Sequence, residues 1–135
     1  MNHLNSLDGI TRDIWSKISD EFNLDSILVF GSIVTEDFYE DSDIDFAVIG
    51  QDRLSLEQKL AFELQLEEIL EREIDVIDLN DPSLDIFVKI QALNNGALVY
   101  TRNHNQTLRK CEEETEYFYR INESFFAKRR RELLL

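Results

Sequence analysis

Cysteine, proline and glycine are all scarce in this chain of 135 residues, which contains one cysteine, one proline and four glycines. The lone cysteine, Cys111, excludes an internal disulfide and a cysteine-based zinc cluster, as is usual in a reducing compartment. No apolar run approaches the length of a membrane span, and the N-terminal region lacks the pattern of a secretion signal. We therefore expect a cytoplasmic protein that has no membrane partner.

Basic residues are also few, because 14 lysines and arginines face 28 acidic residues and the formal net charge is -14. A surface with this charge repels phosphate backbones, so direct binding to nucleic acid is disfavoured. Cations or a basic protein are the partners that such a surface attracts. The apolar fraction of 43% and the length predict one domain over residues 1–135.

Hydrophobic periodicity predicts an α+β fold, in which a small mixed β-sheet packs against helices. Ser55 and Gln58 form a capping box at one helix start, and Leu56, Leu60, Ala61 and Leu64 are its expected buried stripe. The cap of the next helix is expected at Asp81-Pro82 and its end at Asn95-Gly96. Helices are expected over 8–22, 55–72, 82–95 and about 106–134, and strands over 26–30, 43–49, 73–79 and 97–101.

One stretch, residues 27–49, contains most of the candidate site residues. Two apolar runs flank a polar loop that begins with Gly31-Ser32 and ends with Asp43 and Asp45. Side chains alternate along a strand, so these two aspartates lie on one face. If the strand that follows pairs beside this one, Asp75 joins them.

These residue types suit metal-dependent phosphoryl or nucleotidyl transfer. Carboxylates supply the hard oxygen ligands that Mg²⁺ prefers, and Mg²⁺ is typically shared between a protein and substrate phosphates. Two such ions can bind both the attacking and the leaving oxygen. The glycine permits close approach of the backbone to a phosphate, and the serine adds a hydroxyl.

The spacing of Gly31-Ser32, Asp43-Ile44-Asp45 and the later Asp75 resembles the signature of the polymerase-β-type nucleotidyltransferase superfamily. The length of the chain, the segment IDVIDLND and the helical tail are similar to the minimal nucleotidyltransferase (MNT) antitoxins of HEPN/MNT toxin–antitoxin modules. The resemblance implies a minimal polymerase-β-like fold with a long C-terminal helix. It also implies an antitoxin that transfers AMP from ATP to a tyrosine of a partner HEPN ribonuclease toxin and silences it.

The resemblance assigns roles to individual residues. Gly31 and Ser32 would hold the triphosphate of ATP. Asp43 and Asp45 would bind two Mg²⁺ ions, and Asp75 would bind the catalytic ion and help to accept the proton of the tyrosine hydroxyl.

The loop between Ser32 and Asp43 departs from the family, because residues 33–42 include four acids and no base where many members carry a basic residue. Lys89, Arg102 or the metal ions would have to compensate. Two alternatives therefore stay open. The chain is a non-catalytic antitoxin that occludes its toxin with its acidic surface and aromatic tail, or it is a nucleotidyltransferase for a small molecule such as an aminoglycoside.

Overall fold

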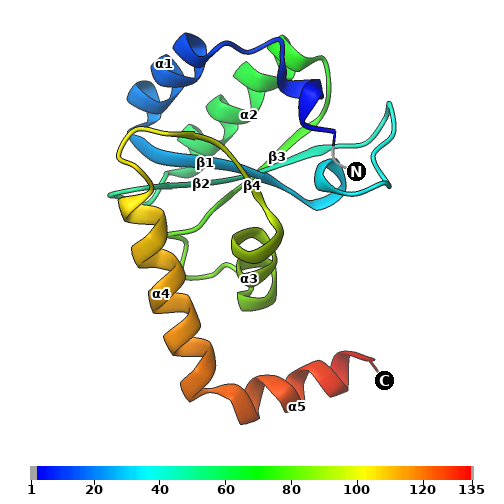
Figure 1. The fold of residues 1–135 in the computed structure, drawn as a ribbon, viewed down its shortest axis with the longest axis vertical. Coiled ribbons are helices and arrows are strands. Elements are labelled where there is room, and N and C mark those ends of the chain that lie inside the picture. Colours follow the sequence, from blue (N-terminus) through cyan, green and yellow to red (C-terminus); the bar gives the residue numbers. More distant parts are fainter. Residues whose placement is uncertain (1–2, 135) are drawn as a thin grey trace.

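The computed structural model describes residues 3–134, which form a four-stranded sheet covered by helices on both faces (Figure 1). The strand order is β3-β2-β1-β4; β1 pairs antiparallel with β2 and β4, whereas β2 and β3 are parallel. The strands are β1 (Leu24–Phe30), β2 (Ile44–Gly50), β3 (Ile74–Asp78) and β4 (Ala97–Thr101). The helices are α1 (Arg12–Phe22), α2 (Leu56–Leu70), α3 (Ile86–Asn95), α4 (Gln106–Ile121) and α5 (Glu123–Leu134), with short 3-10 helices at Leu4–Leu7 and Gly31–Val34.

The core has two layers, one on each face of the sheet. Phe46 of β2 lies between Trp15 of α1 and Phe62 of α2, with ring centroids 5.8 Å from each. On the other face Ala47 and Ile49 pack with Leu108 of α4. Alternation along β2 thus places Asp45 on the same face as Ala47 and Ile49, the face covered by α3 and α4.

The predicted strands are present, and the helix starts are the main differences from expectation. The first helix begins at Arg12, because the side chain of Thr11 accepts a hydrogen bond from the Ile14 backbone and caps it. The third helix begins after Asp85, whose carboxylate accepts from the Phe87 backbone. The expected cap at Asp81 is wrong, since that carboxylate instead accepts from the backbone of Ser83 in a local turn.

Helix α2 has the predicted capping box but buries a different stripe. The Ser55 hydroxyl accepts from the Gln58 backbone, and the Gln58 side chain accepts from the Ser55 backbone. Phe62 and Leu66 are fully buried, whereas the expected stripe is exposed. The predicted leucine stripe is wrong because the helix packs its single phenylalanine, Phe62, against Phe22 and Phe46. In this orientation Leu60 and Leu64 face solvent.

The tail is helical as expected, but it is two helices rather than one long helix over 106–134. At Asn122 the side-chain amide donates to the carbonyl of Phe118, 2.9 Å away, and the backbone N–H turns to the carbonyl of Tyr119. This local competition ends α4. Helix α5 then folds back below α3 (Figure 1), where Phe126 is buried and stacks on Tyr119.

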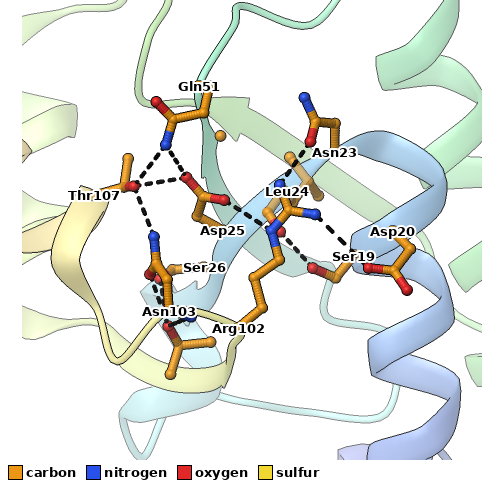
Figure 2. A network of polar contacts seen from close by, with 12 residues as sticks. Ser19, Asp20, Asn23, Leu24, Asp25, Ser26, Gln51, Arg102, Asn103 and Thr107 are labelled. Carbon is orange, nitrogen blue, oxygen red and sulfur yellow. Dashed lines mark hydrogen bonds and ion pairs between the residues drawn. The ribbon is translucent and has the colours of Figure 1, made fainter.

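A buried polar network attaches the start of α4 to β1 (Figure 2). The carboxylate of Asp25, which is 4% exposed, accepts hydrogen bonds from Arg102 Nε at 2.8 Å, Gln51 Nε2 at 2.7 Å and Thr107 Oγ1 at 2.6 Å. Burial alone raises the pKa of Asp25, but these hydrogen bonds outweigh burial and hold the pKa below its ordinary value. None of the helices in residues 3–134 is both long and apolar enough to span a membrane.

Candidate active site

Three aspartates gather at one end of the parallel strand pair. Asp45 of β2 and Asp75 of β3 are register partners, and Asp43 immediately precedes β2. The pairing that would bring Asp75 to the other two aspartates, with the third strand beside the second, is therefore confirmed. Partners in register on parallel strands point to the same face, so Asp75 joins the face that carries Asp45.

The pKa values show that these carboxylates affect one another. Burial raises the pKa of Asp45 to about 6, and the charges of Asp75 and Asp43 add to the increase. Burial also raises the pKa of Asp75, with further contributions from the charge of Asp43 and a hydrogen bond with it. Repulsion of this kind is relieved by bound cations, so the donor set fits Mg²⁺. Within residues 3–134, no three acidic, histidine or cysteine side chains form a ready-made ligand set for a single ion.

Gly31 brings the backbone directly against this cluster. It follows β1, where Phe30 is the register partner of Asp45, and its φ of 75° lies in the left-handed region that favours glycine. A Cβ atom at Gly31 would lie 2.5 Å from Oδ2 of Asp45. Glycine therefore lets the backbone take this turn against the carboxylate, whereas a side chain at position 31 would displace Asp45.

A surface pocket of about 550 Å³ adjoins this turn. Its lining comes from the turn, the loop after it and α3: Gly31, Ser32, Val34, Thr35, Asp37, Gln91 and Asn95. A larger pocket, of about 690 Å³, lies between α3, α4 and α5 and is lined by Phe87 and Tyr119 among others. The smaller pocket is the one that touches the predicted phosphate-binding residues.

Sequence analysis missed further acidic residues around the three aspartates. Glu73 hydrogen-bonds with Asp43, and this bond is the main reason why the pKa of Glu73 is raised. Glu63 and Glu67 of α2 are half-buried and interact electrostatically with Asp75. The position of Phe62 was the signal in the sequence that could have indicated these two residues. When Phe62 and Leu66 form the buried stripe, the residue after each of them borders the sheet.

Neither base that was expected to compensate for the acidic loop lies at the loop. Arg102 belongs to the Asp25 network, and Lys89 lines a pocket beside Gly50 and Asn80 at the opposite end of β2. The guanidinium that does reach the loop is that of Arg72, which donates to the carbonyls of Tyr39 and Ser42. Nothing in the residue pattern around Arg72 indicated this contact, because it joins residues 30 positions apart.

Comparison with protein families matches residues 12–105 to the model described as polymerase beta, nucleotidyltransferase. The matched range covers more than half of the chain and contains the glycine turn and all three aspartates. The chain belongs to the polymerase β nucleotidyltransferase family. A comparison with curated proteins finds no match.

Solved structures share the fold of this nucleotidyltransferase at low sequence identity. A toxin–antitoxin structure with AMP-PNP is 20% identical, with a TM-score of 0.66 and coverage of 88% of this chain and 98% of the other. A complex of a tri-AMPylated Shewanella oneidensis HEPN toxin with an MNT antitoxin is 18% identical, with a TM-score of 0.62 and coverage of 91% and 97%. The MntA-HepT toxin–antitoxin structure is 19% identical, with a TM-score of 0.60 and coverage of 87% and 94%.

Proposed function

We propose that this chain is an antitoxin that uses ATP and Mg²⁺ to transfer AMP to a tyrosine of a partner HEPN ribonuclease toxin. The observation that carries the proposal is the juxtaposition of Gly31 with Asp45, and of Asp45 with Asp75, at one sheet end of a polymerase β family domain. The proposal is supported by similar folds in two solved structures, a complex of an MNT antitoxin with a tri-AMPylated HEPN toxin and a toxin–antitoxin structure with AMP-PNP.

Each residue has a role in this proposal. Gly31 and Ser32 bind the triphosphate of ATP through the pocket that they line. Asp43 and Asp45 would hold two Mg²⁺ ions, and Asp75 would help to hold the catalytic ion. When bound, the ions neutralise phosphate charge and align the nucleotide for displacement.

The reaction is an in-line substitution at the α-phosphorus. The tyrosine oxygen forms the new P–O bond, and the bond between the α-phosphorus and the oxygen that bridges to the β-phosphate breaks, so pyrophosphate leaves. Asp75 also helps to accept the proton that the tyrosine hydroxyl releases. Most of the rate acceleration comes from positioning and charge neutralisation, as in other phosphoryl transfers.

The decisive experiment weighs the partner after reaction. The protein is incubated with Mg²⁺, ATP and the HEPN-type protein encoded beside it, and intact mass spectrometry follows the partner. We expect increments of one AMP unit that map to a tyrosine and that disappear when Mg²⁺ is withheld.

The matched variants distinguish catalysis from binding. Asp43→Ala/Asp45→Ala is expected to abolish the mass increments, whereas Asp8→Ala/Asp52→Ala removes two exposed carboxylates elsewhere and should leave them unchanged. A partner that stays unmodified and yet is inhibited equally by wild-type protein and by Asp43→Ala/Asp45→Ala would overturn the enzymatic proposal.

That outcome would favour a second candidate, an antitoxin that acts by occlusion. Its support is the aromatic elbow, which we define as the exposed apolar residues where α4 meets α5: Tyr117, Phe118, Ile121 and Phe125, each between 49% and 64% exposed. Exposed aromatic clusters of this kind are enriched at protein interfaces. The elbow also serves the enzymatic proposal, because an enzyme that modifies one protein must hold it.

A further inference from the structure

Arg72 makes three contacts with the acidic loop that precedes Asp43. Its Nη1 donates to the carbonyl oxygens of Tyr39 at 2.8 Å and Ser42 at 3.0 Å. Its guanidinium carbon lies 4.3 Å from the ring centroid of Phe38, which is buried in the core. A planar guanidinium can stack on a ring while it donates in its plane, which lysine cannot do.

The residue that follows Arg72 binds the other side of Asp43. The backbone N–H of Ile44 donates to the carbonyl of Glu73 at 3.0 Å. Asp43 therefore lies between two residues, Ser42 and Ile44, that are both hydrogen-bonded to the dipeptide 72–73. Asp75 is two positions further along the same segment, so one short stretch of chain sets the placement of both carboxylates.

Phe38 fixes the middle of the loop in the core, whereas the hydrogen bonds of the segment that follows it are short-range. The Ser42 hydroxyl accepts from the Tyr39 backbone at 2.8 Å, and the Ser42 backbone donates to the Tyr39 carbonyl at 3.1 Å. The loop's acidic residues Glu36, Asp37, Glu40 and Asp41 are exposed like charges close together in sequence, and they repel one another. A guanidinium joined to two loop carbonyls opposes that repulsion where the loop enters β2.

We infer that Arg72 is a positioning residue, which fixes Asp43 relative to Asp75 by clamping the carbonyls of Tyr39 and Ser42 over the ring of Phe38. This inference rests on the proposed function for the role of the two aspartates. Arg72 acts through the loop, because its contacts are with the carbonyls of Tyr39 and Ser42 and with the ring of Phe38.

The test compares Arg72→Gln with Arg53→Gln, which removes the same charge from an arginine whose side chain is 57% exposed and paired with Asp81. With excess partner and ATP, Arg72→Gln is expected to lower kcat by about 10- to 100-fold while KM for the partner stays within about twofold. The Mg²⁺ concentration for half-maximal rate should rise. Arg72→Lys should recover part of the rate, and Arg53→Gln should match wild type.

Two measurements without turnover accompany the rates. Hydrogen exchange of backbone amides in residues 36–43 should be about tenfold faster in Arg72→Gln, with the core strands unchanged. Mn²⁺, titrated calorimetrically in the absence of nucleotide, should bind several-fold more weakly. Thermal unfolding shows whether the variant is folded, and Phe38→Leu, which removes the stacking ring but keeps an apolar side chain in the core, provides a second disruption of the clamp.

The outcomes separate the two ideas. An active wild type with an equally active Arg72→Gln variant overturns the positioning role and leaves the proposed function intact. An inactive wild type overturns the proposed function, and exchange and Mn²⁺ binding then decide on Arg72 alone. If Arg72→Gln matches wild type in both, the clamp does not position Asp43 and the inference is wrong.

Discussion

Asp45 and Asp75 face each other in register across the one parallel strand pair of the sheet. The pairing is parallel because α2 carries the chain from the end of β2 back to the start of β3. Both strands therefore begin at the same end of the sheet (Figure 1). The other strand that contributes to the site, β1, is antiparallel to β2 and delivers Gly31 from its far end. Three chain segments thus meet at one end of the sheet.

The raised pKa of Asp45 predicts how metal-free stability changes with pH. Since the pKa is about 6 in the folded protein against an ordinary 3.8, the folded state loses stability as pH rises from about 4 to 6. Asp45→Asn should therefore be more stable than wild type at pH 7.5, because it removes the unfavourable charge. We expect a gain of only about 1 kcal/mol, since solvent screens a half-buried group. The gain should vanish near pH 4. Urea unfolding in EDTA measures both, and Asp52→Asn is the exposed control; equal stability at pH 7.5 would contradict the prediction.

Gly31→Ala should damage the site more than the fold. The new Cβ would meet Oδ2 of Asp45 at 2.5 Å and sit at a φ of 75°, which costs about 1 kcal/mol for a residue with a side chain. We expect at least a tenfold loss of AMP transfer from displacement of Asp45. Gly9→Ala is the matched control, since its Cβ would meet nothing within 4 Å. An active Gly31→Ala variant would mean that Asp45 can move without consequence.

Asp25→Asn should destabilise the protein by about 2 kcal/mol, because a buried carboxylate loses charge-assisted hydrogen bonds and Arg102 loses its buried acidic partner. The folded pKa of Asp25 is lowered, so its contribution is present above the ordinary value and is lost as pH falls through the folded pKa. The difference between variant and wild type should disappear in strong acid. Asp20→Asn, whose side chain is 74% exposed and 3.7 Å from Arg102, should change stability by less than about 0.5 kcal/mol.

The aromatic elbow should matter for partner binding and little for folding. Tyr117→Ser/Phe125→Ser removes two side chains that are 63% and 64% exposed, so we expect nearly unchanged thermal unfolding. Calorimetry with the HEPN partner should show at least about a tenfold weaker Kd. Leu56→Ser, at a leucine that is 71% exposed on α2, is the control. Unchanged affinity in the double variant would exclude the elbow from the interface.

The sequence predicted the strands and the three aspartates because both depend on local signals. Alternation alone places Asp43 beside Asp45, and one assumption about pairing adds Asp75. The buried side of α2 was not predictable in this way: leucines recur on more than one side of that helix, and only contact with Phe46 selects Phe62. Arg72 was missed for the same reason, since its partners are remote in sequence and are backbone atoms of no particular residue type.

The two ends of β1 contact different parts of the molecule. Phe30 leads into the glycine turn, whereas Asp25 near the other end attaches α4, and about 17 Å of strand separates them at roughly 3.3 Å per residue. Under the proposed function, the strand is a rigid spacer between the site at Gly31 and the two helices, α4 and α5, that carry the aromatic elbow. Substitutions in the elbow are then expected to change which protein is bound without disturbing the residues that act on the nucleotide, so partner choice and chemistry could vary independently.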